Sequence, residues 1–321
     1  MAMKRIGVLT SGGDGPGMNA AIRSVVRYAT SNKLEVMGIF RGYFGLINEE
    51  LKLLDHRSVS NIINRGGTIL KTSRCPEFLT PEGQKQAVET IRKNQIDGLA
   101  LIGGDGTYRG AIELVKKWGV ACIGIPGTID NDLNGTDSTI GSDTAVNTAL
   151  EAIDKIRDTA TSMERIFVVE VMGRESGYIA LQVALAGGAE EVLLPERKFD
   201  MPIMCHEIVD GNIRGKVSWI IIVAEGAAKG EDIARQITEM TDLEARVVVL
   251  GHVQRGGNPT ARDRTLGTRL GAEAVKLLMA GETGKAVGMI SDNINIVDLE
   301  FAVSRKKLEV EAAYRLLKIL T

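Results

Sequence analysis

Two carboxylates lie two residues apart in the segment Pro126-Gly127-Thr128-Ile129-Asp130-Asn131-Asp132. This segment directly follows an apolar run over residues 120–125, and its proline and glycine mark the change from strand to loop. In an open α/β sheet, such a loop lies at the carboxyl end of a strand, where ligands bind. One acid there can accept a proton while the other serves a cation or positions a substrate. The alternative is that Asp130 and Asp132 cap the next helix.

A second candidate site is the segment Gly103-Gly104-Asp105-Gly106-Thr107, which follows an apolar run over residues 97–102. Its glycines would let a phosphate approach the backbone N–H groups, and its acid can hold Mg²⁺ that neutralises phosphate charge. The alternative is a plain glycine turn with an exposed Asp105.

The elements that position these residues follow from the apolar pattern of the chain. Short apolar runs predict strands over residues 5–9, 35–40, 97–102, 120–125, 166–171, 191–194, 219–223, 246–250 and 286–290. Helices are predicted over residues 19–30, 81–94, 108–118, 142–158, 178–186, 203–213, 231–241, 260–279 and, as one final helix, 300–320. Residues 41–80 show a less regular pattern. The alternation predicts the α/β class with parallel sheets.

The first glycine loop, residues 10–17, separates a strand from a helix and is typical of a phosphate-binding unit. Its glycine spacing does not fit the dinucleotide fingerprint, which argues against a dehydrogenase, and no Gly-Lys-Ser/Thr closes it as a P-loop.

Composition narrows the class of protein further. A chain of 321 residues suggests two core units, and a net charge of −2 gives no reason to expect a nucleic acid or a membrane partner. The three scattered cysteines, Cys75, Cys122 and Cys205, are interpreted as reduced thiols of a cytoplasmic protein. We see no signal peptide and no apolar run long enough for a membrane span.

Five motifs occur in one order along the chain. They are Gly12-Gly13-Asp14, residues 103–106, residues 126–132, Met172-Gly173-Arg174 and Gly251-His252-Val253-Gln254-Arg255-Gly256-Gly257. This set resembles the bacterial ATP-dependent 6-phosphofructokinase family over nearly the whole chain. The resemblance implies two Rossmann-like three-layer α/β domains with mainly parallel sheets and an active site in the cleft between them. The larger, ATP-binding domain would comprise residues 1–141 and 254–304, and the smaller, fructose-6-phosphate-binding domain residues 142–253 and 305–321.

The resemblance also implies roles for individual residues in phosphoryl transfer from MgATP to the 1-hydroxyl of fructose 6-phosphate. Asp130 matches the catalytic base, and the other catalytic positions are Thr128, Arg74, Gly13, Asp132 and Arg174. The ATP contacts would be Gly13, Tyr43, Arg74, Cys75, Gly104, Asp105, Gly106, Thr107 and Gly110, with Asp105 as the Mg²⁺ ligand. The sugar-phosphate contacts would be Thr128, Asp130, Asp132, Arg165, Met172, Gly173, Arg174, Glu225, Arg246, His252 and Arg255. In the family, the residues matching Arg165 and Arg246 come from a neighbouring subunit, which implies a homotetramer.

Two glycines help to predict whether ATP or pyrophosphate is the phosphate donor. Pyrophosphate-dependent relatives typically carry Asp where this chain has Gly106 and Lys where it has Gly127, so the resemblance favours ATP. A pyrophosphate-dependent phosphofructokinase and a non-catalytic nucleotide-sensing relative remain the alternatives. The latter predicts loss of Asp130, Asp105 or Arg74, and all three are present.

A further basic set resembles the family's effector site for ADP or phosphoenolpyruvate: Arg23, Arg27, Arg157, Arg214 and Lys216, with Glu190 for Mg²⁺. Arg23 and Arg27 lie one helical turn apart and can also be read as a solvated face. His56-Arg57 and Val217 depart from the pattern of many members, so the strength and sign of any effector response stay open.

Overall fold

The computed structural model describes residues 3–321 and divides the chain into two compact units. Unit 1 contains the residues up to Thr144 together with Arg255–Lys306, and unit 2 contains Ala145–Gln254 together with Lys307–Thr321. Across residues 3–321, no helix is long and apolar enough to cross a membrane.

Unit 1 is built on a mostly parallel sheet with the strand order β11-β10-β5-β4-β1-β2-β3. Its strands are β1 (Arg5–Thr10), β2 (Glu35–Ile39), β3 (Leu51–Leu54), β4 (Gly98–Gly103), β5 (Ala121–Pro126), β10 (Lys285–Ile290) and β11 (Asn293–Asp298). The edge strands β3 and β11 are antiparallel to their neighbours, whereas the strands between them are parallel. Strands β4 and β5 are almost entirely buried, which explains why they read as continuous apolar runs.

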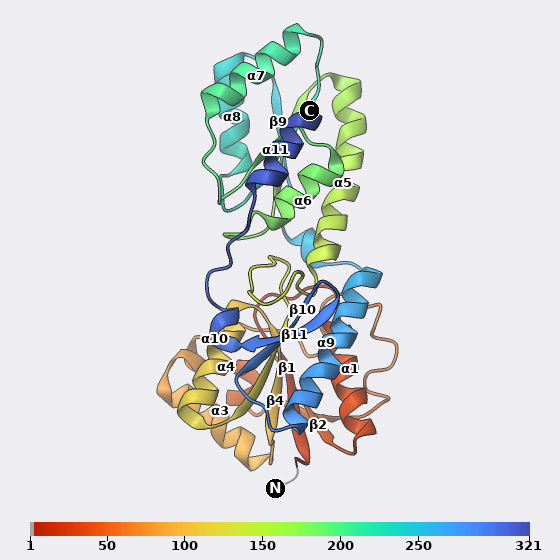
Figure 1. Cartoon of the computed structure of the whole chain (residues 1–321), viewed down its shortest axis with the longest axis vertical. Coiled ribbons are helices and arrows are strands. Elements are labelled where there is room, and N and C mark those ends of the chain that lie inside the picture. Colours follow the sequence, from red (N-terminus) through yellow and green to blue (C-terminus); the bar gives the residue numbers. More distant parts are fainter. Residues whose placement is uncertain (1–2) are drawn as a thin grey trace. The chain divides into compact units, whose positions relative to one another are not determined.

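Helices cover both faces of this sheet, as Figure 1 shows. On one face α1 (Met18–Ser31) packs along α9 (Ala261–Met279), and their apolar sides share one core with the central strands. On the other face lie α2 (Tyr43–Ile47), the 3₁₀ helix η1 (Pro76–Leu79), α3 (Pro81–Lys93), α4 (Asp105–Trp118) and α10 (Leu299–Ala302). Unit 1 is therefore a three-layer α/β structure.

Unit 2 repeats this plan with a smaller, wholly parallel sheet of strand order β7-β8-β6-β9. Its strands are β6 (Ile166–Val171), β7 (Glu191–Leu193), β8 (Trp219–Ala224) and β9 (Ala245–Val249). Its helices are α6 (Tyr178–Gly187), α7 (Met201–Ile213), α8 (Gly230–Thr241) and α11 (Glu311–Leu320), while α5 (Ser142–Met163) carries the chain from unit 1 into unit 2. Helices α7 and α8 share a core with β6 and β8, and α11 packs against α6. The predicted α/β class with mainly parallel sheets is confirmed.

Three features differ from the sequence-based prediction. The single final helix is wrong, because residues 303–310 between α10 and α11 are not helical. Helix α4 begins at Asp105 rather than at Tyr108, so the last three of the five residues of the second glycine motif are helical. The antiparallel edge strands β3 and β11 were missed because neither has a continuous buried run: only Leu54 is buried in β3, and every residue of β11 is partly or fully exposed.

Candidate active site

The carboxyl ends of β1, β4 and β5 lie side by side in unit 1, and their loops are tied together by hydrogen bonds. The Ser11 backbone N–H donates to the Ile102 carbonyl at 3.1 Å, and the Gly127 N–H donates to the Gly103 carbonyl at 3.0 Å. The Thr107 hydroxyl donates to the Ser11 carbonyl at 3.1 Å. The glycine motifs predicted from the sequence therefore meet at one edge of the sheet.

The segment after β5 holds Asp130 in a buried position, with only 3% of the residue exposed. The Asp130 N–H donates to the Thr128 hydroxyl oxygen at 3.2 Å, and the Thr128 carbonyl accepts from the Thr139 hydroxyl at 2.5 Å. Asn131 has a φ of 50°, a left-handed conformation that asparagine tolerates better than most residues. The next helix starts only at Ser142, so the reading of Asp130 and Asp132 as its caps is wrong.

A lysine that the sequence analysis missed supports this acidic segment. The Lys306 ammonium donates to the Thr136 carbonyl at 3.0 Å and to the Asn131 side-chain oxygen at 3.4 Å. Burial lowers the pKa of Lys306, and the nearby carboxylates of Asp132 and Asp137 act in the opposite direction. Lys306 therefore places positive charge beside a segment that carries several acids. It lies far along the chain, where no local pattern singles it out.

A second missed residue, Asp263, anchors the end of the same segment. Its carboxylate accepts from the backbone N–H groups of Gly141 and Thr144, each at 2.9 Å, and from the Thr144 hydroxyl at 2.5 Å. Thr260 in turn donates its hydroxyl to Asp143 at 2.7 Å. Asp263 of α9 thus caps the N-terminus of α5, and the contact between Thr260 and Asp143 ties the two helix starts together. The sequence carries a signal, Thr260-Ala261-Arg262-Asp263, but that motif indicates a local capping box and does not reveal the distant partner.

Gly13 and Arg255, both predicted as site residues, are brought together in unit 1. The Arg255 guanidinium donates to the Asp14 carbonyl at 3.2 Å, and a Cβ added at Gly13 would overlap the guanidinium. The absence of a side chain at residue 13 is therefore what lets a cation lie against the first glycine loop.

The first turn of α4 presents Asp105, Gly106 and Thr107. The Asp105 side chain is 36% exposed and accepts from Arg109 Nε at 2.9 Å. Open space surrounds Gly106, where an added Cβ would meet nothing within 4 Å, whereas a Cβ on Gly104 would contact Thr128. A helix N-terminus with an adjacent glycine suits the binding of phosphate oxygens.

The structure does not gather three or more metal-ligating side chains of His, Cys, Asp or Glu anywhere in residues 3–321. Mg²⁺ is usually held by one or two carboxylates together with substrate phosphates and water. A partly exposed carboxylate such as Asp105, beside space for a phosphate chain, fits that mode of binding.

The remaining predicted nucleotide contacts have different surroundings. The Tyr43 ring is buried, stacks on Phe78 with 3.9 Å between ring centroids, and donates its hydroxyl to the Thr107 carbonyl at 2.6 Å. A Cβ on Gly110 would collide with that ring, so Gly110 is required for packing. Arg74 is exposed, and Cys75 is half-buried beside Glu77 at 3.6 Å.

Gly127 lies in a tighter place than Gly106. A Cβ at residue 127 would lie 2.8 Å from the Ile102 side chain and 3.1 Å from Met18. Core packing is therefore a sufficient reason for glycine at this position. Of these two glycines, Gly106 is the one with free space, so that its missing side chain bears on ligand access.

In unit 2, one group of predicted residues lies at the carboxyl end of β6. Glu225 accepts from the N–H groups of Gly173 and Arg174 at 3.2 and 2.8 Å, and the Met172 N–H donates to the Gln254 side chain at 2.9 Å. Gly173 and Arg174 both have positive φ values, of 150° and 51°. Glu225 therefore fixes a strained turn that carries Arg174.

A second group lies at the opposite end of the same strands. Arg165 directly precedes β6 and Arg246 lies at the start of β9, and both form ion pairs with Glu244, with 3.2 Å between Arg165 Nε and Glu244. Strand β6 has six residues, which puts about 20 Å between its two ends. The structure therefore does not bring Arg165 and Arg246 to Arg174 and Glu225 within one chain. His252 is exposed in the 3₁₀ helix η2 (Gly251–Arg255).

The predicted effector residues also fall into two sets. Arg23 and Arg27 lie on α1 in unit 1, where burial and the neighbouring Arg27 lower the pKa of Arg23. In unit 2, Arg157 donates to the carbonyls of Gly187 and Gly188, and Lys216 lies 3.6 Å from Glu190. Arg214 forms an ion pair with Asp210 at 3.4 Å. Glu190 thus already has a cationic neighbour in this chain.

Comparison with known proteins places the chain in a family context. Residues 5–278 match the family model described as phosphofructokinase. The chain is 54% identical over 319 residues to a protein from Bacillus mycoides named ATP-dependent 6-phosphofructokinase, covering 99% of this chain and all of the relative.

Two solved structures show the same fold. The phosphofructokinase of Pichia pastoris in the T-state superposes with a TM-score of 0.89 at 34% identity, covering 99% of this chain and 37% of that longer chain. A pyrophosphate-dependent phosphofructokinase from Marinobacter aquaeolei superposes with a TM-score of 0.83 at 24% identity, covering 96% of this chain and 86% of that one. This chain thus spans well under half of the Pichia pastoris chain.

Proposed function

The chain belongs to the phosphofructokinase family, and we propose that it transfers the γ-phosphoryl group of ATP to the 1-hydroxyl of fructose 6-phosphate, a step of glycolysis. The observation that carries this proposal is the buried Asp130, held at the carboxyl edge of the sheet beside the glycine loops that follow β1 and β4. The identity with relatives named for the ATP-dependent activity supports the same conclusion.

Asp130 is proposed as the base that accepts the proton of the sugar hydroxyl. Its low exposure keeps bulk water away, and the Thr128 hydroxyl and the left-handed Asn131 fix the backbone that carries it. A carboxylate in such a position contributes by proton transfer and by orienting the nucleophile. Asp132, the residue after Asn131, is proposed to help position the sugar or the metal.

The transferred phosphate would lie where Gly13 meets the loops after β4 and β5. Arg255 already lies against Gly13, and the exposed Arg74 can add a second guanidinium. Guanidinium groups stabilise the negative charge on the transferred phosphoryl group, which accounts for much of the catalysis in this reaction class.

ATP is proposed as the donor because of the space around Gly106. A carboxylate at this position would project from the first turn of α4 into the region that a nucleotide phosphate would occupy, and would repel it. Asp105 would hold Mg²⁺, which when bound supplies positive charge against the phosphate oxygens.

The sugar phosphate is proposed to bind residues of unit 2, and its site is proposed to be shared between subunits of a homotetramer. Arg174 and Glu225 lie at one end of β6, and Arg165 and Arg246 at the other. Because about 20 Å separates these ends, we propose that a second copy of the chain supplies the latter pair. A cytoplasmic location is proposed as well, in keeping with the free thiols of Cys75, Cys122 and Cys205.

Regulation by ADP or phosphoenolpyruvate is proposed at the basic residues of α1 and unit 2. The cations Arg23, Arg27, Arg157, Arg214 and Lys216 support binding of a phosphorylated ligand.

A coupled assay of fructose 1,6-bisphosphate formation tests the function directly. Turnover with MgATP that is lost on chelation of the metal is the expected result, with pyrophosphate a much poorer donor. Efficient turnover with pyrophosphate would favour the pyrophosphate-dependent alternative, and no turnover with either donor would favour a non-catalytic relative. Repeating the assay with ADP and with phosphoenolpyruvate would show the sign of the effector response.

A further inference from the structure

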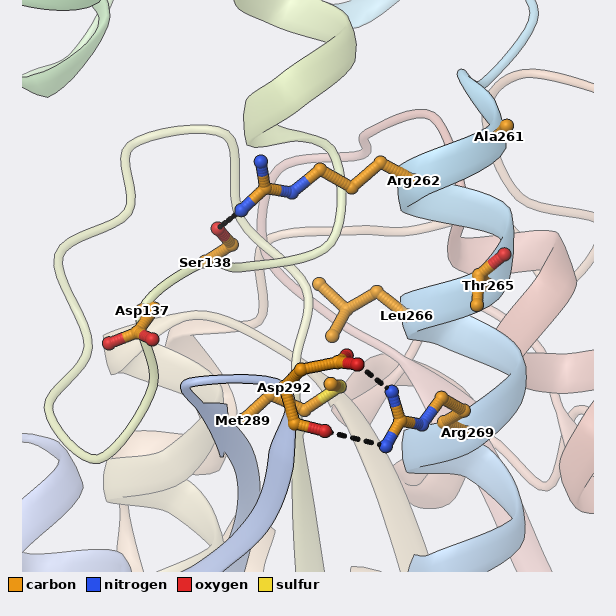
Figure 2. A pocket seen from close by; sticks show the side chains of 9 residues that line it. All are labelled: Asp137, Ser138, Ala261, Arg262, Thr265, Leu266, Arg269, Met289 and Asp292. Atoms are coloured by element: carbon orange, nitrogen blue, oxygen red, sulfur yellow. Dashed lines mark hydrogen bonds and ion pairs between the residues drawn. The ribbon is translucent and has the colours of Figure 1, made fainter.

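A pocket in unit 1 lies outside all of the residues assigned above. It has a volume of about 410 Å³ and lies between α9, the β10–β11 turn and the segment before α5. Figure 2 shows Leu266 and Met289 between two polar ends, with Arg262 and Ser138 at one end and Arg269 and Asp292 at the other. This size and this mixture of an apolar floor with a few polar groups are typical of small-molecule sites.

The charged groups at the second end of the pocket already have partners. Arg269 donates to the Asp292 carboxylate at 2.6 Å and to the Asp292 carbonyl at 2.8 Å, which neutralises both side chains. The Asp137 carboxylate, exposed at the rim, accepts from the Ser291 N–H at 2.8 Å. These groups close one end of the pocket without offering it a cation.

Arg262 differs from them. Its Nη2 donates to the neutral Ser138 hydroxyl at 3.0 Å, and its guanidinium is in no ion pair with any acid of residues 3–321. A guanidinium has five N–H donors in a planar fork, so Arg262 keeps the capacity for a bidentate contact with an anion. The pocket thus offers an uncommitted cation beside an apolar floor.

The remaining charges limit what kind of anion fits. Asp137 and Asp292 both line the pocket, so the four charged side chains sum to zero. A phosphate or nucleotide, which carries two or more charges, would meet these carboxylates as well as Arg262. A single carboxylate joined to a hydrocarbon body would pair with Arg262 and cover Leu266 and Met289.

We propose that this pocket binds a small organic monocarboxylate with an apolar body, with Arg262 as the anchor of the carboxylate. The site is distinct from the proposed ATP, sugar-phosphate and effector residues. Its ligand would be recognised without a phosphate group, unlike the ligands proposed for those sites.

Benzoate is a suitable probe, and its binding to the full-length protein can be followed by saturation-transfer NMR and calorimetry. We expect a millimolar dissociation constant, with weaker binding of the neutral isostere benzamide and of inorganic phosphate. Arg262→Gln removes the charge but retains a donor for Ser138, and should weaken benzoate binding about tenfold. Thr265→Trp places a bulky ring in the pocket from an exposed position of α9 and should abolish binding.

Lys276→Gln is the matched control, since it removes a charge at the other end of the same helix and should leave benzoate affinity unchanged. Circular dichroism of each variant checks that the fold is kept. Failure of benzoate to bind the unmodified protein would overturn the proposal. The proposal would also be overturned if the Arg262→Gln or Thr265→Trp variant bound benzoate as tightly as the unmodified protein, because the ligand would then lie elsewhere.

Discussion

The sheets of the two units place their functional residues differently. In unit 1, Gly13, Asp105, Asp130 and Arg255 all follow or lie beside the carboxyl ends of neighbouring parallel strands. In unit 2, the predicted residues occupy both ends of β6, and its neighbour β9 is an edge strand with Val247 and Val249 exposed by 37% and 52%. Unit 1 can thus assemble a phosphate site from one chain, whereas the predicted contact residues of unit 2 lie at two opposite ends of its sheet.

This difference suggests that the proposed catalytic residues and the proposed sugar-phosphate contacts belong to different parts of the assembly. The residues proposed to handle the transferred phosphate and the proton lie within one chain, where loops are held by short hydrogen bonds and buried side chains. Residues proposed to hold the sugar phosphate would come from two chains. Substitutions in unit 1 should therefore affect kcat, and substitutions at the amino end of β6 and β9 should affect KM for the sugar phosphate and depend on assembly.

The largest effect is expected from Asp130→Ser. Loss of the base should lower kcat by roughly two to four orders of magnitude, because proton transfer and orientation of the hydroxyl are both lost. Substrate affinity measured by calorimetry should change little. Asp154→Ser, an exposed acid on α5, is the control and should retain full turnover. Near-normal kcat in the Asp130 variant would remove this residue from the base role.

The second-largest effect is expected from a substitution that tests whether active sites are shared between subunits. Arg246→Ala should raise KM for fructose 6-phosphate by about 10- to 100-fold through loss of a charged hydrogen bond to phosphate. Co-assembly of this variant with Asp130→Ser chains should recover part of the activity, because some sites then combine an intact Asp130 with an intact Arg246. Each variant assembled alone is the control. If the mixture is no more active than the sum of the two, the sites are complete within single chains.

A smaller effect is expected at Gly106. The Gly106→Asp change should raise KM for ATP about tenfold by repulsion of the nucleotide phosphates, with kcat for ATP also reduced. Stability should not suffer, since an acid in the first turn of α4 interacts favourably with the helix dipole. Gly106→Ala adds size without charge into open space and should behave like the unmodified protein. An equal loss in both variants would show that size rather than charge excludes side chains.

The fold and the site differ in how far the sequence reveals them. Continuous apolar runs such as β4 and β5 are predictable because both faces of each strand are buried, whereas the edge strands β3 and β11 lack that signal. Glycine motifs and acids could be located because each is local. Lys306 and Asp263 could not, since their partners lie more than a hundred residues away. The sequence explained Gly127 only by the identity of the phosphate donor. The close packing of this position against Ile102 is visible only in three dimensions.

The smallest effect on activity is expected from Asp263→Asn. This variant tests whether turnover depends on the loop that Asp263 anchors in unit 1. Asp263 is 1% exposed and accepts three hydrogen bonds from Gly141 and Thr144. An amide would turn a donor toward these donors, at a cost of about 1–3 kcal/mol of folding free energy. We expect kcat to fall only a few-fold. Thr144→Ser keeps the hydroxyl and is the control, and thermal melts with steady-state kinetics measure both effects.

The pH dependence of this variant gives an independent check. Burial raises the pKa of the Asp263 carboxyl above its usual value, although the hydrogen bonds from Thr144 and Gly141 act against that rise. A group with a raised folded-state pKa contributes stability below its unfolded pKa of about 3.9, and this contribution is lost as pH rises through the folded value. Asparagine does not titrate. The melting-temperature gap between the unmodified protein and Asp263→Asn should therefore be widest in acid and narrow toward neutral pH. A gap that widens toward neutral pH would mean that the three donors outweigh burial and that the ionised carboxylate is the more stable form of this anchor.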